Sequence, residues 1–175
     1  MDKIRFNSRI ILIIGILVIL PVINSCRISY SFTGTNLAAN VKTFSVEYFP
    51  NRARLINPNL SQKFTEELRD KLMKQTSLQE LDEAGDLEFS GNVTNYEIRP
   101  MAIQKDDLAA QNRLTITINV KYVNNKEHEV DFEKSFSGFE DFDSGLSFDS
   151  VEEELIDSII EKLIEDIFNA TIANW

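Results

Sequence analysis

The segment 113–123 (RLTITINVKYV) alternates polar and apolar residues from Arg113 to Tyr122. A period of two predicts a β-strand with one face in a hydrophobic core and the other face in water. The apolar positions are Leu114, Ile116, Ile118, Val120 and Tyr122, and the polar positions are Arg113, Thr115, Thr117, Asn119 and Lys121. Such a strand is stable only in a sheet whose apolar face is covered, so the rest of the chain must supply neighbouring strands and a cover.

Three further segments carry strand signals: residues 43–48, residues 87–98 and, after a predicted hairpin turn at 124–126, residues 130–138. Their apolar positions are Phe44, Val46 and Tyr48, then Leu87, Phe89, Val93, Tyr96 and Ile98, then Val130, Phe132 and Phe136. In the second of these segments the alternation changes phase near Asn95, which predicts a β-bulge that returns the apolar side chains to one face. Residues 100–112 and 139–150 lack such alternation and are expected to be loops.

Two segments show the helical period. Asn57 and Pro58 predict the start of a first helix, because Asn is a favoured N-cap and Pro suits the first helical position. Ser150 and Glu153 fit a capping box at the start of a second helix, with Glu152–Glu154 at its positive dipole end. The apolar stripes are Leu60, Phe64, Leu68 and Leu72 in the first helix, and Val151, Leu155, Ile156, Ile159, Ile160, Leu163, Ile164, Ile167 and Phe168 in the second. Each helix is therefore apolar on one side and polar on the others.

These elements occur in the order β-α-β-β-β-α. Two one-sided helices on one face of a roughly four-stranded mixed or antiparallel sheet bury every apolar stripe, so we expect an α+β two-layer sandwich. Residues 41–175 are enough for one such domain.

The N-terminus has the layout of a secretory signal. Lys3, Arg5 and Arg9 precede an apolar run from Ile10 to Ile23, and the only cysteine follows at Cys26. The run has 14 residues, whereas a membrane-spanning helix needs roughly 20. Ile23-Asn24-Ser25-Cys26 resembles a bacterial lipobox, in which the cysteine is lipidated and becomes the mature N-terminus. We therefore expect a signal peptide over 1–25 and a lipidated tether over 26–40; an uncleaved membrane anchor is the alternative.

The expected mature chain is strongly acidic. Without residues 1–25 it holds 15 basic and 27 acidic residues, a net charge of −12. Such a domain repels phosphate backbones, which argues against nucleic acid as a partner. It is also repelled by an anionic membrane surface, so membrane attachment must come from the N-terminal lipid.

The chain lacks a recognisable catalytic motif. Its one histidine, His128, lies between Glu127 and Glu129 in the predicted hairpin turn, where a solvated side chain is the simpler interpretation than a catalytic base. Glu140, Asp141, Asp143 and Asp149 offer oxygen ligands of the kind that calcium prefers, but their spacing fits no EF-hand loop and a solvated acidic loop is the alternative. We predict no enzyme activity, no cofactor and no metal site.

Apolar residues in the two predicted loops pack into the core or face a partner. The candidates for partner binding are Arg99, Met101 and Ile103 in the first loop, and Phe139, Phe142 and Phe148 in the second. For the three phenylalanines the pattern favours the core, with a partner as the alternative, and for the first loop it favours neither.

After Cys26, the run Tyr30-Ser31-Phe32-Thr33-Gly34 resembles the lipopolysaccharide-assembly lipoprotein family LptE. The segments KTFSVEYFPNRA, NPNLSQKFTEELRDKL and GDLEFSGNVTNYEI fit the same family, so that the resemblance spans residues 26–175. It implies two helices on a four-stranded sheet and a non-enzymatic role. Such a lipoprotein plugs an LptD-like outer-membrane β-barrel translocon, assists the folding of that barrel and helps to deliver lipopolysaccharide to the outer leaflet. Arg99, Lys105, Arg113 and Lys121 are the candidates for a basic strip that touches lipopolysaccharide.

Arg27, the second mature residue, is not the Asp that retains lipoproteins at the inner membrane of enteric bacteria, so we expect lipid anchoring on the periplasmic side of the outer membrane. Two other functions remain open: a periplasm-facing envelope lipoprotein that binds another ligand or complex, and an exported hydrolase.

Overall fold

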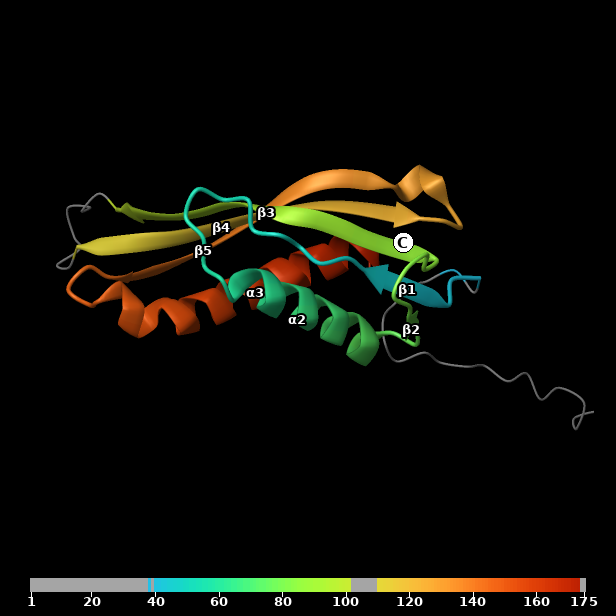
Figure 1. The fold of residues 1–175 in the computed structure, drawn as a ribbon, viewed down its shortest axis with the longest axis horizontal. Coiled ribbons are helices and arrows are strands. Elements are labelled where there is room, and N and C mark those ends of the chain that lie inside the picture. The colour runs from blue at the N-terminus through green and yellow to red at the C-terminus, as the bar shows by residue number, and fades with distance from the viewer. Residues whose placement is uncertain (1–37, 39, 102–109, 174–175) are drawn as a thin grey trace, which may run out of the picture. The chain divides into compact units, whose positions relative to one another are not determined.

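A five-stranded mixed sheet carries two helices on one of its faces, which confirms the predicted α+β two-layer architecture (Figure 1). The computed structural model describes residue 38 and residues 40–101 and 110–173. The predicted signal peptide, Cys26 and most of the tether lie outside these residues, as do Ile103 and Lys105 of the predicted first loop. Among the described residues no helix is both long and apolar enough to cross a lipid bilayer.

The strands follow the spatial order β2-β1-β3-β4-β5. Strand β1 (Thr43–Val46) lies parallel to β2 (Gln79–Glu80) and to β3 (Leu87–Pro100). Strands β3, β4 (Gln111–Asn124) and β5 (Phe132–Asp143) form an antiparallel meander. The short β2 was not expected, and it brings the sheet from roughly four strands to five.

Strand β4 is the centre of the meander, and its alternation is as predicted. Leu114, Ile116, Ile118, Val120 and Tyr122 are all buried. The register between β3 and β4 shifts between Val93 and Asn95, which confirms the predicted bulge. Because of that shift, Val93 and Tyr96 both reach the core although their positions differ in parity.

Helix α2 (Leu60–Gln75) begins two residues later than predicted. Pro58 therefore precedes the helix instead of occupying its first position. Asn57 still caps this end, because its Oδ1 accepts hydrogen bonds from the backbone N–H groups of Asn59 (2.9 Å) and Leu60 (3.0 Å). The predicted stripe of Leu60, Phe64, Leu68 and Leu72 is buried.

Helix α3 (Phe148–Thr171) begins three residues before the predicted start, with Ser147 at its N-cap. The predicted capping box is wrong: Ser150 lies inside the helix and its Oγ donates a hydrogen bond to the carbonyl of Ser147 (2.6 Å). The apolar stripe of α3 is confirmed, since every predicted member is buried except the half-buried Val151.

The predicted loop 139–150 is also wrong in its first half, because β5 continues to Asp143. The core face of β5 carries Phe136, Gly138 and Phe142, so its alternation extends through a glycine and is easily missed. A Cβ atom at Gly138 would lie 3.0 Å from Ile159 of α3, which shows how closely the helix approaches this strand.

Two other ends differ from expectation. Strand β1 stops at Val46, so Tyr48 is 57% exposed, whereas Phe49 is buried and donates its backbone N–H to Thr65 Oγ1 (3.2 Å). The hairpin between β4 and β5 is longer than a tight turn and contains the 3₁₀ turn η2 (His128–Val130), which removes Val130 from the strand.

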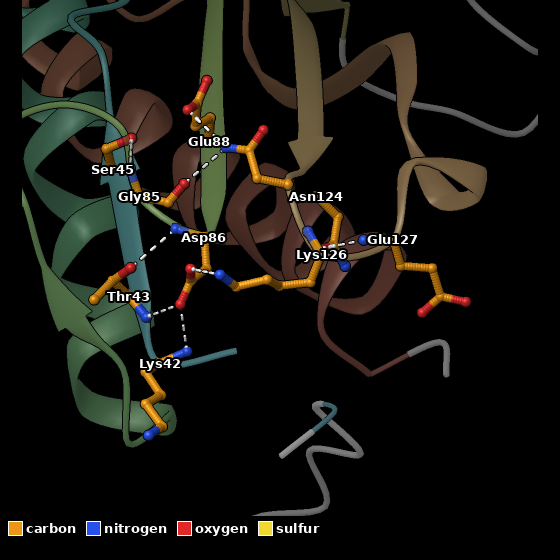
Figure 2. A network of polar contacts seen from close by, with 10 residues as sticks. Lys42, Thr43, Ser45, Gly85, Asp86, Glu88, Asn124, Lys126 and Glu127 are labelled. Carbon is orange, nitrogen blue, oxygen red and sulfur yellow. Dashed lines mark hydrogen bonds and ion pairs between the residues drawn. The ribbon is translucent and has the colours of Figure 1, made fainter. Parts of the chain in front are cut away.

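A network centred on Asp86 joins the start of β1 to the β4–β5 connection (Figure 2). Asp86 Oδ2 accepts the backbone N–H groups of Lys42 (2.8 Å) and Thr43 (3.1 Å), and Oδ1 receives Lys126 Nζ (2.8 Å). The hydrogen bond from Lys126 and those from the two backbone amides lower the pKa of Asp86 from 3.8 to about 2. The network therefore clamps three separate segments through one ionised carboxylate.

Candidate functional site

The face of the sheet opposite the two helices is not covered by either of them (Figure 1). We call it the open face and define it by Ser90 and Asn92 of β3, Thr115, Thr117 and Asn119 of β4, and Ser135, Ser137 and Phe139 of β5. Each of these side chains is half-buried or exposed. Apart from Phe139, they belong to the polar half of the alternation whose apolar half is buried in the core.

The middle of the open face consists of short, uncharged polar side chains in cross-strand rows. Asn92, Asn119 and Ser135 form one row, since Asn119 pairs with both of its neighbours. In the next row, Thr117 Oγ1 and Ser137 Oγ lie 3.0 Å apart and share a hydrogen bond. Short Ser, Thr and Asn side chains lose little entropy on ordering, and they both donate and accept hydrogen bonds. This surface can therefore form hydrogen bonds with another polar surface.

At one end of the open face, Arg113 pairs across β4 and β5 with Asp141. Arg113 Nε and Nη2 donate to the two carboxylate oxygens of Asp141 at 2.7 and 2.8 Å. The guanidinium also lies over the ring of Phe139, 3.8 Å from its centroid. The hydrogen bonds from Arg113 lower the pKa of Asp141. The pair holds Phe139 in place although that side chain is 48% exposed.

Two of the predicted partner-binding residues adjoin this pair. Arg99 lies directly opposite Arg113 in the β3–β4 register, and its Nε binds Glu97 Oε1 at 2.8 Å. Met101 follows the end of β3 and is exposed. We define the distal cluster as Arg99, Met101, Arg113, Phe139 and Asp141. Three residues predicted from two separate loops thus lie on one end of the sheet.

The other predicted residues do not join the cluster. Phe142 is only 7% exposed and its ring lies 5.7 Å from that of the half-buried Phe148, so these two aromatics follow the core alternative. Cys26 and Ile103 lie outside the described residues. Of the predicted basic strip, Lys121 stands at the opposite end of the open face, across from Ser90 and Glu133, and Lys105 is not described.

The helical layer has a very different electrostatic character. Helix α3 carries eight acidic residues and one lysine, a net charge of −7. Only part of this charge is neutralised across the layer, by pairs of Lys63 with Asp157 and Lys71 with Glu165. The acidity of the chain is therefore concentrated on the side away from the open face.

Candidate catalytic and metal groups are dispersed. His128 is exposed and its Nδ1 lies 3.0 Å from Asp131 Oδ2, in the turn before β5. Glu140 binds Lys162 and Ser158 of α3 on the core side of β5, whereas Asp141 points to the open face. Within the described ranges, no group of three or more His, Cys, Asp or Glu side chains is placed to hold a metal ion.

The residues of the central rows were not predicted as functional. The sequence does carry a signal for them, because the alternation of residues 113–123 predicts that their polar positions share one face. What the pattern could not give was the register that aligns Asn92, Asn119 and Ser135 in one row.

The family model LptE, described as lipopolysaccharide-assembly, matches residues 41–171. No curated protein is similar to the chain at a significant level. Among solved structures, a hypothetical protein from Chlamydia trachomatis shares 7% identity with a TM-score of 0.51, covering 74% of this chain and 97% of that one. A minor lipoprotein from Acinetobacter baumannii shares 13% identity with a TM-score of 0.47, covering 72% and 88% respectively. At these identities the structural likeness concerns the fold alone.

Proposed function

This chain belongs to the lipopolysaccharide-assembly family LptE, and we propose that it is the non-enzymatic, lipid-anchored plug and assembly partner of an outer-membrane β-barrel translocon. In this proposal Cys26 carries the lipid, the domain lies on the periplasmic side of the outer membrane, and the open face lies against the inner wall of the barrel. The barrel is the LptD-like partner expected for the family.

The observation that carries the proposal is the contrast between the two sides of the domain. The inner walls of transmembrane β-barrels are polar, because only their outer surface meets lipid. A centre of Asn, Ser and Thr side chains can match such a wall by hydrogen bonds without burying an unpaired charge. The −7 charge of α3 makes the helical side a poor fit to the same wall unless that wall is basic.

The distal cluster supports a second contact, with lipopolysaccharide itself. Arg99 and Arg113 occupy the same cross-strand row, and Met101 and Phe139 expose apolar surface beside them. The two arginines could bind phosphate groups, and the apolar side chains could contact acyl chains. Since Arg99 and Arg113 already bind Glu97 and Asp141, a phosphate must compete with a carboxylate at each position.

Co-purification tests the proposal. The full-length tagged protein is extracted from outer membranes in mild detergent, beside Asn119→Trp in the centre of the open face and Glu154→Trp on the exposed surface of α3. We expect the wild type and Glu154→Trp to bring down one β-barrel protein in equimolar amount. Asn119→Trp should recover about tenfold less barrel, because a bulky indole separates the two surfaces.

If the wild type brings down other envelope proteins and no barrel, the chain is a periplasm-facing lipoprotein of another complex. If the barrel is recovered equally with all three proteins, the open face is not the contact surface. Melting temperatures of both variants, measured on the purified proteins, show whether each remains folded.

A further inference from the structure

Strand β5 is an edge strand with one side unpaired among the described residues. All twelve of its residues pair with β4 in one unbroken register, and β5 is last in the strand order. An edge strand presents a row of free N–H and C=O groups to any chain that can lie beside it. Helix α3 packs against the core face of β5 and not along this row, since Ile159 and Leu163 lie over Gly138.

The register shows which residues point their backbone groups outward. Just beyond β5, the N–H of Ser144 donates to the carbonyl of Ala110 (3.0 Å), so this pair belongs to the hydrogen-bonded set. Hydrogen-bonded pairs alternate with non-bonded pairs in an antiparallel ladder. The even-numbered residues of β5 therefore bind β4. The odd-numbered residues Glu133, Ser135, Ser137, Phe139 and Asp141 direct their N–H and C=O groups to the free edge.

The central part of this edge lacks the usual protection against a further strand. Natural edge strands are guarded by proline, bulges, charged side chains or short length. Residues 135–139 (SFSGF) contain no proline and no charge, and the β4–β5 register has no bulge. The nearest charges are Lys134, stacked over Phe136, and Glu140, bound to α3. At the opposite edge of the sheet, β2 is only two residues long.

A hollow of about 310 Å³ follows the same stretch of edge. Its lining comes from β5 on one side and from α3 on the other, and consists of Ser137, Gly138, Phe139, Glu140, Asp141, Lys162 and Asp166. The hollow gives side chains of an added strand a place between β5 and α3. Alternate side chains of an added strand would point into it, as occurs where peptides extend a sheet.

We propose that the β5 edge receives an extended segment of the barrel partner's polypeptide, which adds to the sheet as a sixth strand. This inference rests on the proposed function and names a second mode of contact with the same partner, through backbone hydrogen bonds. A neutral or basic segment fits best, because the acidic α3 borders the edge. The same acidity disfavours a second copy of this chain, which would bring two helices of charge −7 together.

A proline at an outward position tests strand addition separately from contacts made by the side chains of the open face. Ser137→Pro removes an outward N–H and leaves the β4–β5 ladder intact, as proline on an edge strand can. Ser137→Ala keeps that N–H but loses the same hydroxyl on the open face. In co-purification from outer membranes, we expect Ser137→Pro to recover about tenfold less barrel than Ser137→Ala.

Residue-resolved amide exchange on the purified complex gives an independent result. The amides of Ser135, Ser137 and Phe139 should exchange rapidly in the free full-length protein and at least about tenfold more slowly in the complex. The inward amides of Phe136 and Gly138 should be slow in both. Ser135→Pro and Ser135→Ala, at the next outward position, repeat the comparison in case one proline variant fails to fold.

The outcomes are distinct. Equal recovery with folded Ser137→Pro, or outward amides that stay fast in the complex, overturns the strand-addition proposal and leaves the plug function standing. Outward amides already slow in the free protein mean that the chain's own N-terminal segment or a second copy fills the edge, which also overturns it. Absence of any barrel with the wild type overturns the proposed function itself.

Discussion

The side chain of Asp86 fixes the start of strand β1. Its side chain is 17% exposed, and its carboxylate accepts two backbone amides at the start of β1 and pairs with Lys126 beyond β4. A carboxylate bound in this way stabilises the fold only while it is ionised. The free energy of unfolding should therefore depend on pH, and substitution of Asp86 alone should remove that dependence.

We predict that Asp86→Asn destabilises the domain by about 1–2 kcal/mol at pH 7. The folded-state pKa of about 2 lies below the ordinary value of 3.8, so the stabilisation is complete above pH 4–5 and is lost as the pH falls toward 2. Urea unfolding of both proteins at several pH values measures the difference. A gap between wild type and variant that stays constant down to the lowest pH would contradict the assigned role of the carboxylate.

Phe139 belongs to the open face and contributes little to folding. Because nearly half of its side chain is exposed, Phe139→Ala should lower the free energy of unfolding by less than about 1 kcal/mol. It should nevertheless reduce the amount of barrel recovered from outer membranes. Met73→Ala removes a comparably exposed side chain from α2 and serves as the control, for which recovery should not change. Equal recovery of the barrel with both variants would show that Phe139 does not contact it.

At the scale of elements, α3 provides the larger share of the cover for the sheet. Its stripe from Leu155 to Phe168 is buried against β4, β5 and α2. This stripe was predicted in full, because a period of 3.6 with nine apolar members is a strong signal. The start of the helix was not, since Ser150 and Glu153 imitate a capping box three residues inside it.

Ile160 tests this cover, because its side chain is 0% exposed. Ile160→Asp places an unpaired carboxylate in the core and should destabilise the domain by more than about 4 kcal/mol, enough to unfold it. Glu161→Ala changes the adjacent exposed position and should alter the free energy of unfolding by no more than about 0.5 kcal/mol. Circular dichroism with thermal melting distinguishes the two. A folded Ile160→Asp protein with an unchanged melting temperature would refute the two-layer packing.

The strands also show which features a sequence pattern can predict and which it cannot. Strand β4 was predicted closely because every position from 113 to 122 obeys the alternation. Strand β5 was cut short at Gly138, since a glycine and a lone glutamate interrupt the apolar positions of its core face. Strand β2 has only two residues and arises from pairing with β1, which no local pattern encodes. The rows of the open face depend on register in the same way.

At the scale of the whole molecule, lipid attachment and docking are predicted to be separate functions. In the proposed arrangement a lipid at Cys26 would provide the membrane anchor, and the folded domain would provide the partner contacts. We expect Cys26→Ala to fold with an unchanged melting temperature but to leave the membrane fraction, because the acidic domain has no affinity of its own for an anionic surface. Fractionation and intact mass of the mature chain measure this; membrane retention of the variant at the wild-type level would argue for an uncleaved anchor.

Delivery of lipopolysaccharide to the cell surface shows whether this chain acts in the translocon. The chain is depleted, and newly made lipopolysaccharide in the outer leaflet is quantified together with the level of assembled barrel. We predict that both fall together, and that wild type and Glu154→Trp restore them whereas Asn119→Trp does not. Normal surface lipopolysaccharide and normal barrel assembly in depleted cells would contradict a role for this chain in the translocon.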